Sequence, residues 1–170
     1  MRRVRYRVAA SLDGYIGGPS GEVDWIVSDP AFNWGEVYAG FDTVLLGRRT
    51  YELTQKPGAP PWPAGWRVYA FSSTLPSGHR GGVTFIATDA AAAVGALRAE
   101  GGKDIWLFGG GALASSLLGA RLVDVVEVTI VPVLLGAGIP LFAKGAPQTL
   151  LRLTDSRAYP SGLVTLRYEV

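Results

Sequence analysis

Cysteine is absent from this 170-residue chain, and histidine and methionine occur once each. Without cysteine there is no disulfide bond, no thiolate metal ligand and no cysteine nucleophile. The single histidine, His79, leaves too few ligands for a typical zinc site, so we expect no metal. One methionine beside 23 glycines is typical of a turn-rich α/β protein rather than a helical bundle.

A strong net charge and long apolar runs are also missing. The net charge is only +2, which gives no reason to expect a nucleic acid partner. No apolar stretch approaches the roughly 20 residues that span a bilayer, so we expect no membrane association. Near the N-terminus Arg3, Arg5 and Arg7 alternate with apolar residues, which predicts a strand with a solvated arginine face rather than an apolar leader. We expect one cytoplasmic domain over residues 1–170.

The most informative stretch is a glycine turn between an apolar run and a helix-forming segment. Residues 104–108 read as a buried strand and residues 112–118 as a helix, with Gly109, Gly110 and Gly111 at the junction. The first amides of a helix lack internal partners, and glycines let a ligand approach the backbone closely. This arrangement favours an anion site, usually for phosphate, with a plain tight turn as the alternative.

Two further predicted strands end in polar groups. The strand over residues 42–47 is followed by Arg48 and Arg49, and cations at a helix start oppose the helix dipole unless an anion lies nearby. A later strand ends in Ser72 and Ser73. Ligands gather at the carboxyl ends of parallel strands, so the three signals together predict a phosphate site.

The order of elements predicts an α/β fold. We count about eight strands and four helices, interleaved in the first two thirds of the chain, with strands alone at the end. The expected sheet is mixed and mostly parallel, and residues 150–157 and 163–170 form a C-terminal antiparallel hairpin. The first helix is expected to begin with Asp29 as its N-cap. Its aromatic surface, which includes Trp34 and Tyr38, serves either the core or a pocket for a planar substrate.

The ordered set of motifs resembles the dihydrofolate reductase superfamily, most of all the branch with the reductase domain of riboflavin-biosynthesis deaminase-reductases and many small reductases. The resemblance covers essentially the whole chain and is carried by residues 9–17, 42–52, 71–73, 108–111, 128–129 and 132–142. It implies a three-layer dihydrofolate reductase-like fold around an eight-stranded sheet. It also implies that NADPH delivers a hydride to a small planar heterocycle or a conjugated carbonyl or imine, similar to a pterin, a pyrimidine or a riboflavin precursor.

The resemblance also assigns cofactor contacts by position. They are Ala9, Ile16, Gly47, Arg48, Arg49, Thr50, Ser72, Ser73, Gly109, Gly110 and Gly111. The arginines and Thr50 would hold phosphates, the two serines would lie near the adenosine 2′-phosphate, and Ala9 and Ile16 would border the nicotinamide. The loop over residues 17–25 would act as a lid that excludes water.

The substrate half departs from the folate reductase pattern, because the spacing between Asp29 and Gly47 does not fit it. We therefore expect a substrate other than dihydrofolate. Substrate contacts are assigned to Trp25, Trp34, Tyr38 and Thr129. The proposed catalytic acids are Asp13, Asp29 and Glu36, with Asp24, Tyr38 and water as further proton sources. Asp13 could equally cap the turn before the lid.

Two alternatives stay open at this point: a non-catalytic nucleotide-binding protein on the same fold, and a true dihydrofolate reductase. A Rossmann-type dehydrogenase is disfavoured, because the glycines follow the fifth strand and lack the Gly-x-Gly-x-x-Gly spacing. The β-branched residues 123–131, with the apolar loop after them, are a candidate face for a homodimer.

Overall fold

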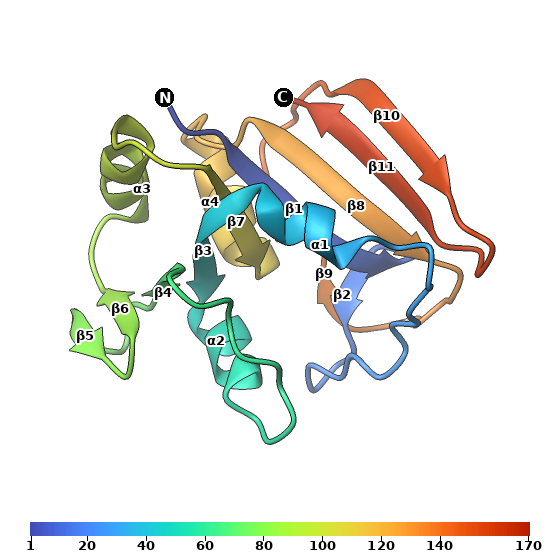
Figure 1. Cartoon of the computed structure of the whole chain (residues 1–170), viewed down its shortest axis with the longest axis horizontal. Coiled ribbons are helices and arrows are strands. Elements are labelled where there is room, and N and C mark those ends of the chain that lie inside the picture. Colours follow the sequence, from blue (N-terminus) through green and yellow to red (C-terminus); the bar gives the residue numbers. More distant parts are fainter.

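The computed structural model describes residues 1–170 and contains one large central sheet. Its strands are β1 (Val4–Ser11), β3 (Phe41–Gly47), β4 (Arg67–Phe71), β5 (Gly78–Arg80), β6 (Val83–Ile86), β7 (Asp104–Gly109), β8 (Val125–Val131), β10 (Arg152–Ala158) and β11 (Val164–Glu169). They lie in the order β10-β11-β8-β1-β7-β3-β4-β6-β5 (Figure 1). The strands from β8 to β6 run parallel, while β11 and β5 pair antiparallel at the two sides. The expected mixed, mostly parallel sheet is confirmed.

Alternation along β1 sets the two faces of the sheet. Val4 and Tyr6 are fully buried on one face, so Arg5 and Arg7 point to the other. The expectation that this arginine face is solvated is wrong for Arg5 and Arg7, whose side chains are only 14% and 12% exposed. Both guanidinium groups pair with Glu127 on the neighbouring strand β8, which compensates the charges that burial would otherwise leave unpaired.

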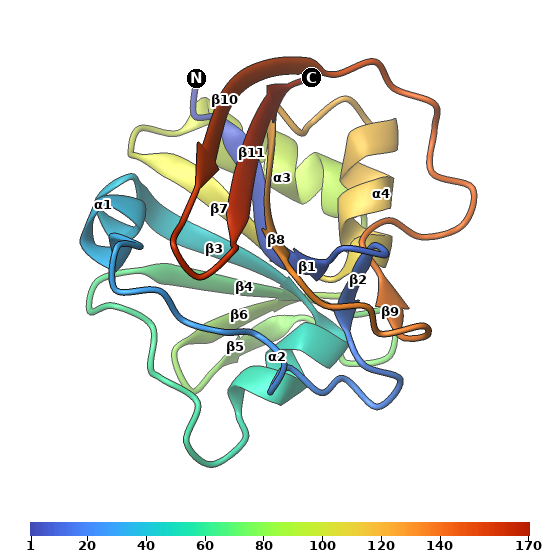
Figure 2. The same cartoon turned by 90° about the vertical axis from the view of Figure 1, so that its right-hand side faces the viewer.

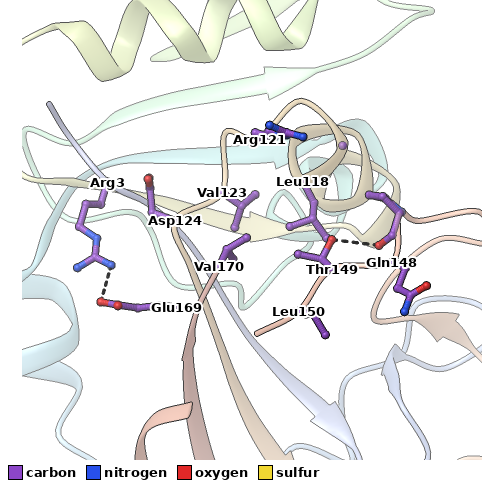
Figure 3. Close-up of a pocket in the computed structure, with 12 residues that line it drawn as sticks. Arg3, Leu118, Arg121, Val123, Asp124, Gln148, Thr149, Leu150, Glu169 and Val170 are labelled. Atoms are coloured by element: carbon purple, nitrogen blue, oxygen red, sulfur yellow. Dashed lines mark hydrogen bonds and ion pairs between the residues drawn. The ribbon is translucent and has the colours of Figure 1, made fainter. Parts of the chain in front are cut away.

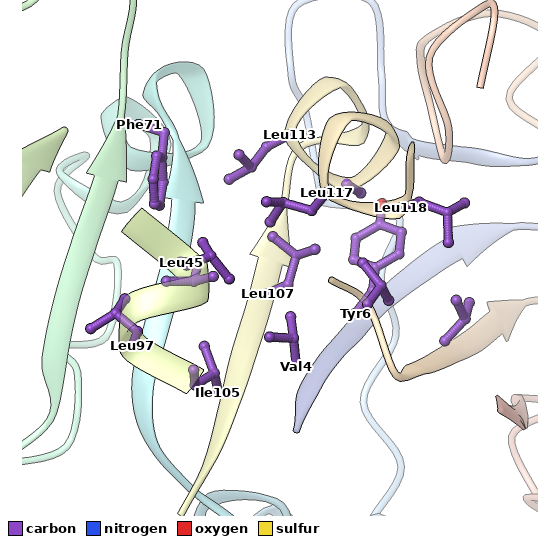
Figure 4. Close-up of a cluster of buried hydrophobic side chains, with 14 of the residues drawn as sticks. Val4, Tyr6, Leu45, Phe71, Leu97, Ile105, Leu107, Leu113, Leu117 and Leu118 are labelled. Atoms are coloured by element: carbon purple, nitrogen blue, oxygen red, sulfur yellow. The ribbon is translucent and has the colours of Figure 1, made fainter. Parts of the chain in front are cut away.

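Helices cover both faces of the sheet and complete three layers (Figure 2). They are α1 (Trp34–Ala39), α2 (Arg48–Thr54), α3 (Ala90–Ala99) and α4 (Gly111–Gly119). The larger core lies beneath α3 and α4 and includes Leu45, Leu107 and Leu117 (Figure 4). Full burial of one such leucine contributes roughly 1.5–3 kcal/mol. On the opposite face, α1 packs Val37 against a second core that contains Trp106.

The central sheet has nine strands rather than the expected eight, because β5 adds an edge strand. β5 contains His79, and all three of its residues are exposed. It forms by backbone pairing with β6, and the imidazole Nδ1 of His79 lies 3.2 Å from the Thr84 hydroxyl. A strand this short and exposed leaves no hydrophobic alternation in the sequence.

A small second sheet lies beside the start of α4 (Figure 2). Its two strands are β2 (Tyr15–Gly17) and β9 (Ile139–Pro140). β9 falls in the apolar segment after β8 that the sequence indicates as irregular. The Leu141 amide donates to the Gly14 carbonyl, and the Tyr6 hydroxyl donates to the Leu141 carbonyl. These bonds tie the segment after β8 to both β1 and the turn before β2.

The expected helix start at Asp29 is wrong, because the N-cap of α1 lies four residues later. Asn33 is the N-cap of α1, and its side chain accepts from the Glu36 amide. The two carboxylate oxygens of Asp29 accept instead from the amides of Ala31 and Ser161, at 2.7 and 2.9 Å. Ser161 belongs to the turn between β10 and β11. Asp29, which the local pattern assigns to the helix start, therefore binds a distant turn instead. By contrast, Asp89 is the N-cap of α3, and its side chain accepts from the amides two and three residues later.

The C-terminal antiparallel hairpin is confirmed as β10 and β11. β11 also pairs with β8, so β8 lies inside the sheet between β1 and β11. Six of the seven residues of β8 are buried. The homodimer face expected over residues 123–131 is therefore not available on this strand. None of the helices has the length and apolar character needed to cross a membrane.

Candidate functional site

A cleft with a volume of about 1140 Å³ opens at the carboxyl ends of the parallel strands. These ends point toward α2 and β2 in Figure 1. The cleft brings together three features that the sequence places far apart: the arginines after β3, the serines after β4 and the glycine turn after β7. Of the eleven predicted cofactor residues, Gly47 alone is not part of the lining. The cleft thus lies at the strand ends, where the sequence predicts a phosphate site.

A second hollow of about 940 Å³ lies at the opposite end of the sheet and contains none of the predicted site residues (Figure 3). Three of its four charged side chains form ion pairs, and the exception is Arg121. Arg3 forms an ion pair with Glu169 at 3.1 Å, and Asp124 pairs with Arg98 at 2.6 Å. Charges already neutralised in this way leave little for a ligand to bind, so we assign the function to the cleft at the carboxyl ends.

The glycine turn presents bare backbone to the cleft. Gly110 is the N-cap of α4, and no side chain caps the first amides of this helix. The Gly109 to Gly110 peptide bond is cis. A Cβ atom on Gly111 would lie 2.5 Å from the Pro140 carbonyl oxygen, so only glycine allows β9 to pack against the start of α4. The free amides and the lack of side chains make this turn suitable for an anionic ligand.

Some of the polar side chains around the turn already have partners within the protein, and others do not. Arg48 pairs with Glu52 one turn later at 2.9 Å, whereas Arg49 forms no ion pair. The Ser72 hydroxyl accepts from the amides of Thr74 and Leu75 and so caps its own turn. Arg49 is therefore the guanidinium most available to a ligand at this end of the cleft.

Aromatic side chains form the other half of the cleft. Phe32, Trp34, Trp106 and Phe108 all line it, and Trp106 and Phe108 stand on β7 directly before the glycine turn. These two β7 aromatics are not among the predicted site residues, although their spacing of two along a strand puts both side chains on one face. Such a surface suits a flat ligand.

The predicted substrate residues divide into two groups. Trp34 and Thr129 line the cleft, and the Thr129 hydroxyl lies 2.9 Å from the Thr165 hydroxyl. Trp25 and Tyr38 are not part of the lining. The Trp25 indole donates to the Glu22 carbonyl within the loop, and Tyr38 packs on the Trp34 ring with centroids 5.7 Å apart.

The three carboxylates predicted as catalytic lie in different places. Asp13 lies outside the cleft and accepts from the Ser11 hydroxyl and the Gly136 amide, which lower its pKa, with the Ser11 bond as the main cause. Glu36 on α1 is also outside the cleft. Asp29 lines the cleft, but its hydrogen bonds to Ser161 and Ala31 lower its pKa. A carboxyl with a lowered pKa is ionised at neutral pH and is a poor proton donor.

Replacing Asp29 by asparagine is expected to reduce the stability of the fold at neutral pH and to flatten its dependence on acid. The folded pKa is lowered, so the carboxylate contributes stability above its unfolded pKa, and this contribution is lost as the pH falls through the lower, folded value. An asparagine offers one acceptor oxygen to two amide donors. Thermal unfolding at neutral pH and at pH about 3 measures the change. Asp155→Asn, on the exposed strand β10, is the control. An equal change in stability in both variants would show that the two hydrogen bonds of Asp29 do not stabilise the fold.

Arg7 is a further charged residue of the cleft, although its alternation with apolar residues predicts a solvated face. It lines the aromatic half, with its guanidinium carbon 5.6 Å from the centre of the Phe32 ring. Burial is the main cause that lowers its pKa, to about 10, and the nearby Arg5 adds to the effect. Arg7 therefore stays protonated at neutral pH. No local signal reveals this position, because Glu127, its partner, comes 120 residues later.

Comparison with known proteins agrees with this geometry. Residues 66–165 match the RibD C-terminal domain family. The uncharacterised protein YyaP of Bacillus subtilis is 33% identical over 178 residues, which cover 98% of this chain and 94% of YyaP. A candidate riboflavin biosynthesis protein from Shewanella sp. PV-4 has a crystal structure that matches with a TM-score of 0.83 and 25% identity, over 99% of this chain and 98% of that one.

A more distant structure shares the fold alone. Dihydrofolate reductase from Enterococcus faecalis, solved as a complex with NADP(H) and RAB-propyl, matches with a TM-score of 0.73 at 16% identity. The match covers 98% of this chain and 95% of that enzyme. The resemblance inferred from the motifs is thereby confirmed: the chain belongs to the RibD C-terminal domain family and has the dihydrofolate reductase-like fold.

Proposed function

We propose that the protein is an NADPH-dependent reductase that transfers a hydride to a small planar heterocycle or a conjugated carbonyl or imine. The observation that carries this proposal is one continuous cleft with two different halves. One half gathers arginines, hydroxyls and free helix amides at the strand ends, and the other is lined by aromatic rings. A polyanionic cofactor beside a flat acceptor is the combination that such a lining fits.

The lining offers donors suited to a dinucleotide. Arg48, Arg49 and Thr50 would hold its phosphates, and the amides at the start of α4 would receive the pyrophosphate. Ser73 would lie near the 2′-phosphate together with Ser72, while Gly47 keeps space behind the turn: a Cβ there would lie 3.3 Å from the Gly110 nitrogen. When bound, NADPH supplies the hydride.

The remaining lining residues would position the acceptor and exclude water. Ala9 and Ile16 would border the reacting face of the cofactor, and Thr129 would contact the acceptor beside Ala9, its neighbour across the β1 and β8 pairing. The predicted lid over residues 17–25 contributes Gly21, Val23 and other residues to the lining and so lies where closure would cover the reaction.

The proton for the product has no strong donor among the predicted carboxylates. Asp29 is ionised and occupied by two amides, and Asp13 and Glu36 do not line the cleft. Water admitted at the cleft mouth, or Asp24 in the lid, would therefore deliver the proton. This assignment favours acceptors whose reduction leaves an anion that is stable enough to be protonated from solvent.

The test of the proposal combines binding and hydride transfer. We expect calorimetry to show that NADPH binds at least about tenfold more tightly than NADH, because the extra phosphate would accept charge-assisted hydrogen bonds from the hydroxyls of Ser72 and Ser73. We also expect the absorbance of NADPH to fall when suitable planar acceptors are added, dihydrofolate being one member of the panel. Binding of NADPH with no loss of absorbance for any acceptor would favour the non-catalytic alternative. Failure to bind either nucleotide would overturn the assignment of the cleft.

A further inference from the structure

One arginine, Arg7, lines the aromatic half of the cleft. Arg7 and Ala9 are two residues apart on β1, so both side chains leave the sheet on the same face. Each faces a different residue of β8: Arg7 pairs in register with Glu127, and Ala9 with Thr129. The remaining cations of the lining, Arg48, Arg49 and Lys56, come from α2 and the loop after it. Arg7 is thus the cation on the acceptor side.

The Arg7 guanidinium has more donors than acceptors. Arginine carries five N–H groups, and the side chain of Arg7 donates to Glu127 alone. Glu127 is itself shared, since its other oxygen accepts from Arg5 at 2.9 Å, while Arg5 has a further acceptor in Asp104 at 3.4 Å.

The spare donors of Arg7 reach open space rather than a sealed interior. The buried side-chain atoms that lack any partner belong to Arg2 and Arg5, and none belongs to Arg7. The Arg7 side chain nevertheless keeps only 12% of its surface exposed, and it lies on the cleft wall next to Phe32. A protonated guanidinium with free donors in so enclosed a place binds an anionic oxygen group more strongly than one on an open surface.

The distance between Arg7 and Ala9 along β1 sets the size of the acceptor that can reach both residues. Two residues of a strand span about 7 Å, which is close to the width of one six-membered ring with a substituent. An acceptor whose reducible atom lies over Ala9 and Thr129 therefore reaches Arg7 with its far edge. The ring would lie among Phe32, Trp106 and Phe108.

We propose that Arg7 is a specificity-determining residue that selects planar acceptors bearing a carboxylate or another anionic oxygen group at the edge opposite the reducible atom. The placement of the reducible atom rests on the proposed function, whereas the anion preference of the cleft does not. Carboxylate and phosphate substituents share the chemistry that Arg7 recognises, and matched probes distinguish the two.

The experiment compares planar rings that differ by one anionic group. Orotate against uracil, and nicotinate against nicotinamide, test a carboxylate, and phenyl phosphate against phenol tests a phosphate. Binding is followed by calorimetry, with and without NADPH. We expect the preferred anionic member of a pair to bind about 10-fold to 100-fold more tightly than its neutral partner. Equal affinities within all three pairs would overturn the proposal.

Variants assign the preference to Arg7. Arg7→Met should abolish it, Arg7→Lys should retain part of it, and Arg121→Met, an exposed arginine outside the cleft, should leave it unchanged. Glu127 keeps Arg5 as a partner in Arg7→Met, which protects the fold. Persistence of the preference in Arg7→Met would overturn the proposal. Anion preference without NADPH binding would support the Arg7 site and contradict only the proposed reductase. NADPH binding without anion preference would contradict the Arg7 site and leave the proposed reductase standing.

Discussion

The double substitution Arg48→Ala with Arg49→Ala is expected to weaken NADPH binding by about 100-fold or more while leaving the fold intact. Each charge-assisted hydrogen bond to a phosphate contributes roughly 1.5–3 kcal/mol, and because Arg48 is partly exposed and Arg49 is exposed, the loss falls toward the lower end. Stability should hardly change. Arg48 loses only an exposed pair with Glu52, and two cations leave the start of α2, where they oppose the helix dipole.

Calorimetry with NADPH at two salt concentrations measures this effect. The wild type should lose affinity as salt rises, and the double variant should respond less, because fewer charge contacts remain to be screened. A double variant with Arg121→Ala and Lys144→Ala removes the same charge from exposed sites outside the cleft and serves as the control. Comparable losses in both double variants would point to general electrostatics rather than a phosphate site.

Replacing Gly111 by alanine is expected to damage stability and cofactor binding together. The new Cβ would lie 2.5 Å from the Pro140 carbonyl oxygen and 2.9 Å from that of Leu141, distances that real Cβ atoms do not adopt. Either α4 or β9 must move, and overpacking of this kind typically costs about 1–3 kcal/mol or more. Because α4 starts at the glycine turn, we also expect NADPH affinity to fall roughly tenfold or more.

Gly95 provides a matched control for this substitution. It also lies in a helix, α3, but nothing is within 4 Å of the position that a Cβ would take. Gly95→Ala should therefore stabilise the protein by about 0.5–1 kcal/mol and leave NADPH binding unchanged. Urea unfolding and calorimetry on both variants provide the measurement. A stable Gly111→Ala protein with normal affinity would show that β9 does not pack closely against α4.

Features set by neighbouring residues could be predicted from the sequence. The Asp89 cap depends on amides two and three residues later, and the glycine turn depends on one strand followed by one helix. Arg48 and Arg49 could be placed in the cleft because parallel strands end at the same edge. These local patterns, together with the family resemblance, gave the fold class and the cofactor half of the candidate site.

Features set by distant partners could not be predicted. Asp29 has the local sequence pattern of a helix cap, but it accepts a hydrogen bond from the Ser161 amide, 132 positions away. Arg7 has the sequence pattern of a solvated strand residue, but its side chain is largely buried and pairs with Glu127 on β8. β5 exists only through its pairing with β6. Periodicity reports which face a residue occupies but not what covers that face, and the acceptor half of the cleft is made mostly of such contacts.

The position of β1 inside the sheet governs how the chain acquires its structure during synthesis. β1 hydrogen-bonds to β7 on one side and to β8 on the other, and both partners follow it by about a hundred residues. A nascent chain that has reached only β6 therefore holds an unpaired β1 with Val4 and Tyr6 uncovered. Loop closure over such separations is slow, so folding should take milliseconds to seconds. Until β7 and β8 emerge from the ribosome, β1 is therefore open to chaperones and to aggregation.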